Sequence, residues 1–288
     1  QRDSLDDYLR SYREGKFLKD ASAGDAVFSE TLKNKSEVDC KEEFKSDSAI
    51  IKQLFEETEL NLFESRFNSS NDKNGARKNI LDELKKHGGA TRKVVVFKRN
   101  IERMKGVLKQ KHPNFFLAID HIFDNLLLQS FGDRSIKWSP LLLVGSPSIG
   151  KTEFVLSIAE VFKLPYEIID LSTAQSSTML VGSESHWANS HPGAIPELIT
   201  STPYINGICV LDEVDKSSPN PNHLPISALY GLLEARSATK FKDLFVGVPM
   251  DASHINWIAT ANTTSTIPDP ILSRFCVITI PDPTANDL

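Results

Sequence analysis

Long apolar runs are missing from this sequence of 288 residues. The run LLLV at 141–144 is among the longest, and it is far shorter than the roughly 20 apolar residues that cross a bilayer. The first residues, QRDSLDDYLRSYRE, are charged and contain no apolar stretch of the kind found in secretory signal peptides. These two absences argue against a membrane-spanning or secreted protein.

Cysteine is scarce, and the three present, Cys40, Cys209 and Cys276, lie too far apart for a metal-binding pair. Cys209 and Cys276 stand in apolar, strand-like runs, which predicts that both are buried thiols. Free thiols without a signal peptide are typical of a reducing compartment. The sequence therefore predicts a cytoplasmic protein.

Internal repeats and low-complexity tracts are also missing. The apolar content of 40% and the charged content of 25% are those of a soluble globular protein. A chain of 288 residues can form one large domain or two ordinary ones, and either would bury a sizeable core.

Charge is distributed unevenly along the chain. Residues 139–288 contain 7 basic and 15 acidic residues, whereas residues 73–111 contain 13 basic and 3 acidic ones. A basic stretch of this kind can contact nucleic acid or an acidic partner. No set of aromatic residues alternates with the charges, which disfavours binding of single strands. A solvated helical face is the simpler interpretation, and contact with nucleic acid stays a weaker alternative.

Three regions follow from the sequence pattern. Residues 1–75 are polar and partly helical, with apolar residues at helical spacing in SAIIKQLFEETELNLFESRF. Residues 76–110 are predicted to form a helical linker, in which KVVVF could be a strand or a buried helical turn. Residues 111–288 are predicted to form one α/β domain that begins with the amphipathic helix FFLAIDHIFDNLLLQSF.

Short, nearly all-apolar segments alternate with helical patterns after residue 139. Five of them are predicted strands: PLLLVG, YEIIDLS, GICVLDE, INWIATAN and CVITIP. Strands with this composition are buried on both faces, as in a parallel sheet covered by helices. We therefore expect an α/β fold with a five-stranded parallel sheet, the first of these strands at its centre.

The first predicted strand runs directly into GSPSIGKT, which has the pattern GxxxxGK[ST] between a strand and a helix. Glycines allow backbone N–H groups to turn toward phosphate, and the start of a helix favours an anion. Lys151 is expected to reach the outer phosphates of ATP, and the hydroxyl of Thr152 to bind Mg²⁺. The candidate nucleotide-binding residues are Gly145, Ser146, Pro147, Ser148, Ile149, Gly150, Lys151, Thr152 and Glu153.

The segment ICVLDE places two carboxylates at the end of a buried strand, where ligands bind in open α/β sheets. Asp212 is the candidate metal partner of Thr152. Glu213 is the candidate general base that orients the attacking water. A strand that merely ends in solvated acids is the alternative, and the preceding phosphate loop makes it less favourable.

Two further polar residues follow apolar strands. Asn262 ends INWIATAN, where its amide could contact the γ-phosphate or orient water, although a simple turn would also explain it. Arg274 follows in PDPILSRF, and its permanent charge suits a clamp on the nucleotide of a neighbouring subunit. An exposed arginine without a role is the alternative there.

Four motifs described above occur in this order: the phosphate loop, ICVLDE, the strand that ends in Asn262 and the segment that contains Arg274. Their order resembles that of the AAA+ ATPases. Over residues 100–283 the sequence is similar to the ATPase module of Lon-type proteases. The segments that carry this similarity are DEVDK, FKDLFVGVPMDASHINWIATANTTSTIPDPILSRFCVI and VGSESHWANSHPGAI. The resemblance implies the nucleotide roles given above, a sensor role for Asn262, a finger role in trans for Arg274, and a ring that usually has six subunits.

The resemblance is limited to the ATPase part of that family. The chain ends at Leu288, where such proteins would continue into a helical lid and a protease domain. We therefore expect the lid and the peptide-cutting residues to be absent from this chain. Peptidase activity is accordingly not assigned to these residues.

The segment VGSESHWANSHPG contains one large aromatic residue in a polar loop. In the Lon-like alignment, Trp187 and Ala188 occupy the aromatic and aliphatic positions of the loop that lines the central pore. An aromatic side chain there could grip an extended polypeptide by apolar contact. Packing of Trp187 into the core is the alternative, because indole is costly to expose.

The function that follows is ATP hydrolysis in a ring, with ATP and Mg²⁺, coupled to unfolding or translocation of a polypeptide substrate. A nucleotide-gated regulatory module that threads no substrate is the second hypothesis. Remodelling of nucleic acid through residues 73–111 is a third and weaker one.

Overall fold

The structure is a computed structural model, and it describes residues 50–69, 76–97, 101–173, 177–184, 190–217 and 225–284. The chain divides into two compact units, Gln1–Ser48 and Ala49–Leu288. All of the described residues belong to the second unit. The domain boundaries predicted at residues 75 and 110 both fall inside this unit and stay predictions.

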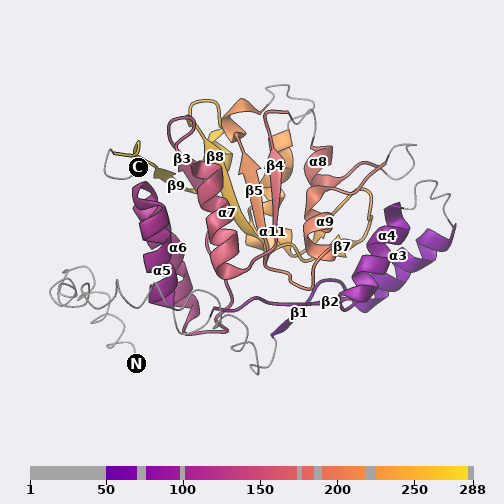
Figure 1. The fold of residues 1–288 in the computed structure, drawn as a ribbon. Helices are drawn as coiled ribbons and strands as arrows, with labels where there is room; N and C mark the ends of the chain where they lie inside the picture. Colours follow the sequence, from indigo (N-terminus) through magenta and orange to yellow (C-terminus); the bar gives the residue numbers. More distant parts are fainter. Residues whose placement is uncertain are drawn as a thin grey trace. The chain divides into compact units, whose positions relative to one another are not determined.

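Five parallel strands form the main sheet of the second unit (Figure 1). They are β3 (Leu141–Val144), β4 (Tyr166–Asp170), β5 (Ile208–Asp212), β8 (Asn256–Ala261) and β9 (Cys276–Thr279). Across the sheet their order is β4-β5-β8-β3-β9, and each neighbouring pair is parallel. All five strands predicted from apolar runs are confirmed, and so is the α/β class.

The strand before the glycine-rich loop, β3, is an interior strand but not the middle one. It lies between β8 and β9, with Leu142 paired to Ala259 on one side and to Val277 on the other. The middle strand is β8. The expectation of a central β3 is therefore corrected, because an apolar run indicates burial on two faces without specifying a position among the interior strands.

The two edge strands are less buried than their apolar sequences suggest. Tyr166 and Ile168 of β4 are 47% and 37% exposed, and Val277 of β9 is 43% exposed. Each of these strands has a single neighbour in the sheet. The same position explains the two thiols: Cys209 on interior β5 is buried as predicted, whereas Cys276 at the start of β9 is only partly buried.

Alternate residues of each interior strand face two separate apolar cores. Leu142 and Ala259 belong to the first core, and Leu141 and Ile258 belong to the second. Successive side chains of a strand point to opposite faces, so the two cores lie on opposite sides of the sheet. Helices must cover both faces, which is why these strands are apolar throughout.

Three helical segments cover the face of the second core: α5 (Ile101–Lys111), α6 (Phe116–Gln129) and α7 (Lys151–Phe162). A 3₁₀ turn, η3 (Pro113–Phe115), joins α5 to α6. Ile119 of α6 and Phe154 of α7 are buried completely in this core. Figure 1 shows α7 across the sheet and α5 beside α6. The helical character expected of residues 76–110 is confirmed in α4 and α5, and the helix expected at 115–131 is confirmed as α6.

Short elements cover the first core. The helical ones are α8 (Thr178–Val181), α9 (Ala194–Thr200), η4 (Val214–Lys216), η5 (Pro225–Ala228), α10 (Leu229–Leu232), α11 (Ala235–Ala238) and α12 (Asp269–Leu272). β6 (Phe241–Lys242) and β7 (Pro249–Met250) form a small antiparallel pair.

The segment before the α/β core is helical only in part. α3 (Glu57–Ser69) and α4 (Ala76–Lys86) are helices, but β1 (Ile51–Gln53) is a strand that pairs with β2 (Thr91–Lys93). The helix expected to include residues 51–53 is therefore corrected. Three- and four-residue apolar spacing over so short a run does not separate a helix from a strand followed by a helix.

The run KVVVF is neither a full strand nor a helical turn. β2 ends at Lys93, and the following residues are extended, with an isolated antiparallel bridge between Val96 and Ser135. Lys93 also forms a parallel bridge to Tyr204. This stretch therefore ties the first part of the unit to the segment before β5.

Arg92 fixes β2 in place through hydrogen bonds that its buried side chain makes to backbone carbonyls. Its side chain is buried, and its guanidinium donates hydrogen bonds to the backbone carbonyls of Ile199, Gly89 and Thr91 at 3.0, 3.0 and 2.8 Å. Burial lowers the pKa of this guanidinium to about 10. Carbonyl dipoles from α9 and from the turn before β2 thus stabilise a charge that has been removed from water.

No helix among the described residues is both long enough and apolar enough to cross a membrane.

Candidate nucleotide site

The loop between β3 and α7 has the backbone geometry that phosphate binding requires. Ser148 and Gly150 have φ angles of 63° and 91°, both in the left-handed region. Left-handed residues in a tight loop turn successive N–H groups toward one side, and α7 begins directly after Gly150. The first N–H groups of α7 have no side-chain cap, so they are available to an anion.

Gly145 is required at the start of this loop because two atoms leave no room for a larger side chain. A Cβ atom there would lie 2.6 Å from Cδ1 of Ile149 and 2.8 Å from the carbonyl oxygen of Ile280. The N–H of Gly145 donates to the carbonyl of Ala261 at 3.2 Å. The loop is thus fixed against β8 and against the residue that follows β9.

Lys151 is held over the loop by three acceptors. Its Nζ lies 2.8 Å from the carbonyl oxygen of Gly145, 2.9 Å from that of Ser146 and 3.1 Å from Oδ1 of Asn262. Partial burial lowers the pKa of Lys151, and the nearby carboxylate of Asp212 opposes that shift. The two residues expected to contact the outer phosphates, Lys151 and Asn262, are therefore in direct contact with each other.

Asp212 ends β5 beside the start of α7. Its Oδ2 accepts a hydrogen bond from Oγ1 of Thr152 at 3.2 Å, and its Oδ1 accepts one from the hydroxyl of Thr260. A hydroxyl and a carboxylate are hard oxygen ligands of the kind that Mg²⁺ prefers. Thr152 and Asp212, predicted as metal ligands, thus lie close enough to share one ion.

Glu213 is the first residue beyond β5 and has an unusual backbone conformation. Its φ of 56° is left-handed, which is uncommon for a residue with a long side chain. Its N–H donates to Oγ1 of Thr260 at 3.1 Å, and its carboxylate is ion-paired with Lys216. The strained turn directs Glu213 away from the strand direction and fixes its backbone to β8.

Asp215 ties the turn after β5 to the end of β8. Its Oδ2 accepts hydrogen bonds from the N–H groups of Asn262 and Thr263 at 3.1 and 3.3 Å, and its carbonyl accepts one from Thr266 at 2.7 Å. Its Oδ1 is buried without a hydrogen-bond partner among the described residues. An unpaired carboxylate oxygen in the wall of the site could accept from a bound water.

Three residues of the site, Thr260, Asp215 and Lys216, were not predicted from the sequence. Thr260 stands two residues before Asn262 on the same strand, so both side chains face the same way. Asp215 and Lys216 lie in the DEVDK motif, one turn beyond the two carboxylates that were selected. These spacings were the available signals for all three residues.

The site is a cavity of about 330 Å³ at the carboxyl ends of β3, β5 and β8. Its lining residues are Pro147, Ser148, Gly150, Lys151, Thr152, Glu153, Asp212, Glu213, Asp215, Thr260, Ala261 and Asn262. Three of the nine predicted loop residues, Gly145, Ser146 and Ile149, are not among them. Ile149 packs on the second core instead, and Gly145 and Ser146 contribute the carbonyls that hold Lys151.

Arg274 lies outside this cavity in the described part of the chain. It follows α12, its guanidinium donates to the carbonyl of Pro270, and its Cζ lies 5.5 Å from the ring centre of Tyr230. It does not reach the nucleotide site of its own chain in this arrangement. Contact with the site of another subunit stays a prediction.

Trp187 and Ala188 lie outside the described residues, so the proposed pore contact is a prediction. The two ends of their loop are described and are fastened together. Ser183 N donates to the carbonyl of His191 at 3.0 Å, and His191 N donates to Oγ of Ser183 at 2.8 Å.

Asp243 holds the base of this loop. It is completely buried, its Oδ2 accepts from Gly193 N at 3.0 Å, and its Oδ1 accepts from the N–H groups of Phe245 and Val246. Burial raises the pKa of Asp243 to about 6, although the three N–H donors oppose the shift. A Cβ at Gly182 would lie 2.6 Å from Oδ2 of Asp243, so a larger residue would not fit there.

Five of the 13 basic residues in 73–111 form ion pairs with acidic residues of the chain. Lys105 and Lys109 both contact Asp120 at 2.7 Å, and Lys111 contacts Glu153 at 3.3 Å. On α4, the basic side chains Lys85 and Lys86 form ion pairs with Glu64 and Glu83 at 3.2 and 3.0 Å. Charge that is already paired contributes little to phosphate binding, which weakens the nucleic-acid alternative.

Comparison with known proteins identifies the class first. Residues 141–281 match the model of the AAA family, the ATPases associated with various cellular activities. This match covers the sheet and every predicted nucleotide-site residue. Residues 141–281 therefore resemble the ATPase module of the AAA family.

The individual proteins to which the chain is similar are Lon proteases. The chain is 35% identical over 189 residues to a Lon protease of Clostridium beijerinckii, which covers 65% of this chain and 24% of that protein. It is 32% identical over 180 residues to Lon protease 1 of Syntrophotalea carbinolica, covering 62% of this chain and 22% of that protein. The chain therefore spans about a quarter of the length of these relatives, and its module is Lon-like.

A solved structure supports the fold. A closed-state cryo-electron microscopy reconstruction of Hsp104 with ATPγS and casein matches with a TM-score of 0.51 at 16% identity. The match covers 62% of this chain and 35% of that chain. At this identity the likeness concerns the fold alone.

Proposed function

We propose that this chain binds ATP with Mg²⁺, hydrolyses it in a ring of identical subunits, and couples hydrolysis to the unfolding or translocation of a polypeptide. The observation that carries the proposal is the convergence of Lys151, Thr152, Asp212, Glu213 and Asn262 on one cavity. Three different strands bring these residues together, in a chain whose residues 141–281 match the AAA family.

In this proposal, nucleotide binding relies on the loop and Lys151. The ammonium group exchanges its bonds to the carbonyls of Gly145 and Ser146 for bonds to phosphate oxygens, which are stronger acceptors because they are charged. The backbone N–H groups after Ser148 and the start of α7 add donors without a side chain. Loss of Lys151 therefore removes binding itself.

The residues that would hold Mg²⁺ are Thr152 and Asp212. The ion would neutralise charge on the phosphates and fix their orientation. Thr260 keeps the carboxylate of Asp212 oriented by a hydrogen bond to Oδ1, which leaves Oδ2 facing Thr152. Substitution of Thr260 is thus expected to act through Asp212.

Glu213 is the proposed general base. Its carboxylate accepts a proton from the attacking water as the water bonds to the γ-phosphorus and the bond to the β-phosphate oxygen breaks. Its pairing with Lys216 must loosen first, because a carboxylate bonded to an ammonium group is less available to water. Asn262, already in contact with Lys151, would contact the γ-phosphate or orient the attacking water.

Arg274 is proposed to act on the nucleotide of the next subunit. It lies outside its own cavity on an exposed turn, and its charge cannot be lost at physiological pH. A site that needs a residue from a neighbour is incomplete in a monomer. The ring, its subunit number and the pore role of Trp187 and Ala188 are parts of this proposal.

The deciding experiment measures ATPase activity of the 288-residue chain with no addition, with an unfolded polypeptide and with duplex DNA. Stimulation by the polypeptide, together with unfolding of a tagged substrate, supports the proposal. Nucleotide-dependent assembly without either effect would favour the regulatory module, and stimulation by DNA would favour the third hypothesis.

A second experiment tests the role of Trp187. In Trp187→Ala, near-normal melting temperature and ATPase rate with lost substrate unfolding support a role in gripping polypeptide. A large fall in melting temperature would mean that the indole is part of the core.

A further inference from the structure

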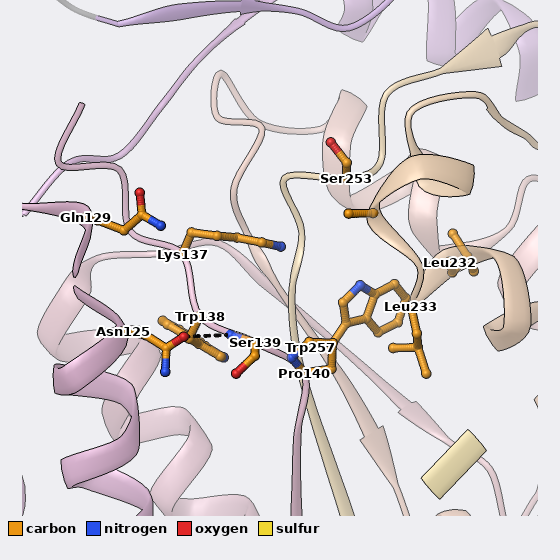
Figure 2. A pocket seen from close by; sticks show the side chains of 11 residues that line it. Asn125, Gln129, Lys137, Trp138, Ser139, Pro140, Leu232, Leu233, Ser253 and Trp257 are labelled. Atoms are coloured by element: carbon orange, nitrogen blue, oxygen red, sulfur yellow. Dashed lines mark hydrogen bonds between the residues drawn. The ribbon is translucent and has the colours of Figure 1, made fainter. Parts of the chain in front are cut away.

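A second cavity, of about 240 Å³, lies at the opposite end of the sheet from the nucleotide site (Figure 2). Its wall is built from residues just before β3, from the start of β8, and from α6, α10 and α11. The lining residues are Asn125, Gln129, Lys137, Trp138, Ser139, Pro140, Leu232, Leu233, Ala235, Ser253 and Trp257. None of them belongs to the nucleotide cavity.

Lys137 supplies a cation to this wall without an ion-pair partner. Its Nζ donates a hydrogen bond to the carbonyl of Ile255, and no carboxylate of the described residues lies within 4.0 Å of it. Burial lowers the pKa of Lys137 to about 8, although the charge of Asp251 opposes the shift. An ammonium group largely removed from water, with protons left over after one hydrogen bond, is stabilised by an anion.

The cavity also offers apolar surface beside that cation. Trp257, Leu232 and Leu233 are all buried, and Trp257 and Lys137 line the same cavity (Figure 2). Trp138 contributes a second indole, and its buried Nε1 has no hydrogen-bond partner among the described residues. Flat apolar rings favour a flat apolar partner.

Two neutral polar side chains of the wall, Asn125 and Gln129, differ in whether they are free to bind a ligand. The side chain of Asn125 is engaged, because its Oδ1 accepts from Ser139 N at 3.2 Å and its Nδ2 donates to the carbonyl of His121 at 2.8 Å. The side-chain amide of Gln129 makes no hydrogen bond to the described residues. Figure 2 shows Gln129 near the start of the Lys137 side chain, whose ammonium end extends away from it, toward Trp257. One cation and one free amide therefore remain for a ligand.

We propose that this cavity is a second ligand site, which binds a small molecule with one carboxylate on a flat apolar body. The carboxylate would contact the ammonium group of Lys137, and the body would lie against Trp257 and Leu233. One ammonium group matches one negative charge, whereas a phosphate group would need more positive charge than the wall provides. The size of the cavity favours a free small molecule over a folded partner.

The position of the cavity makes this site independent of ATP. Pro140 directly precedes β3 and Trp257 is in β8, whereas the loop after β3 and Asn262 after β8 lie at the other ends of the same strands. The ligand and the nucleotide thus occupy opposite ends of two adjacent strands. Binding here does not compete with ATP.

The test is titration of the 288-residue chain with benzoate and with indole-3-carboxylate, by calorimetry or ligand-observed NMR. The neutral amides benzamide and indole-3-carboxamide are matched controls for charge. We expect both acids to bind, and to bind at least about tenfold more tightly than the amides, because a hydrogen bond to a charged group is worth more than a neutral one. Saturating ATP and Lys151→Ala should leave binding unchanged.

Two variants locate the site. Lys137→Gln keeps a donor for Ile255 but removes the charge, and should weaken binding of the acids about tenfold or more. Ala235→Trp should fill the cavity and abolish binding of acids and amides alike. Lys240→Gln, at an exposed lysine elsewhere, is the control and should change nothing.

Three results would overturn the proposal. They are no binding of either acid at millimolar concentration, equal binding of acids and amides, or binding unaffected by both Lys137→Gln and Ala235→Trp. A tetrapeptide that ends in phenylalanine is included to separate a free acid from a chain terminus. Binding of that peptide alone would also overturn the assignment to a free small molecule.

Discussion

The carboxylate of Glu213 is ion-paired with the ammonium group of Lys216, three residues further along the same turn. The hydrogen bond between them raises the pKa of Lys216. Both groups reach solvent, so the pair is weak and can open at little cost. The carboxylate proposed as the catalytic base is therefore paired with a neighbouring cation until this ion pair opens.

Lys216→Ala is expected to raise basal ATPase activity, because it frees Glu213 from its competing partner. An ion pair this exposed is weak, so the increase should not exceed about fivefold. Steady-state hydrolysis without added substrate measures this. Lys216→Arg keeps the pair and is the control; lower activity in Lys216→Ala than in Lys216→Arg would show that Lys216 assists turnover instead.

Glu213→Gln should keep nucleotide binding and lose most turnover, by about 10²–10⁴-fold, because the amide cannot accept a proton from water. Lys151→Ala should lose binding, since the backbone loop then lacks its only long-reaching cation. Nucleotide affinity and hydrolysis rate, measured for both variants, separate the two roles. Normal hydrolysis in Glu213→Gln would remove Glu213 from the mechanism.

Arg274→Ala should bind ATP normally and lose hydrolysis in the assembled ring, by about 10³–10⁵-fold if the residue is an arginine finger. Mixed with Glu213→Gln subunits, it should recover part of the activity, because some interfaces then pair an intact arginine with an intact base. Rings that demonstrably mix and stay inactive would exclude action in trans. Mass measurements of the mixed assemblies provide the necessary check.

Asp243 should make stability depend on pH in an unusual direction. Its pKa is about 6 in the folded chain and 3.8 in the reference state, so the folded form binds the proton more tightly. The stabilisation is fully present only below the unfolded value of 3.8 and is lost as pH rises through 6, a total change of about 3 kcal/mol.

Asp243→Asn removes that titration. The free energy of unfolding of the variant, relative to the parent chain, should improve by roughly 2 kcal/mol between pH 4 and pH 7. Denaturant unfolding at both pH values measures the difference. Asp282→Asn, at an exposed carboxylate, is the control, and a difference for Asp243→Asn that does not change with pH would contradict the argument.

The sheet was predictable because its interior strands are nearly all apolar and are bounded by turn residues. The order of the strands was not, since every interior strand has the same pattern. β1 shows a second limit: Ile51–Gln53 is held as a strand by β2, 40 residues further on, and no local pattern reveals that partner.

The nucleotide site was predictable where chemistry dictates both residue type and spacing. Lys151, Thr152, Asp212, Glu213 and Asn262 converge as expected, because the carboxyl ends of adjacent parallel strands meet at one edge. The supporting contacts were not predictable. Thr260 acts by bridging Asp212 to the backbone of Glu213, a role that depends on β5 and β8 being neighbours.

The cavity at the other end of the sheet has no sequence signature. Lys137 and Trp257 are 120 residues apart, and each looks ordinary in its own segment. Only the pairing of β3 with β8 brings the residues before one strand next to the start of the other. Sites assembled this way become visible with the fold.

The exposed side chains of β4 have a practical consequence for the isolated chain. Tyr166 and Ile168 stand on an edge strand, whose free backbone groups are a template for pairing with another strand. Unless another surface covers this edge, it favours self-association and precipitation at high concentration. Charge introduced at Ile168 would discourage such pairing along this edge of the sheet.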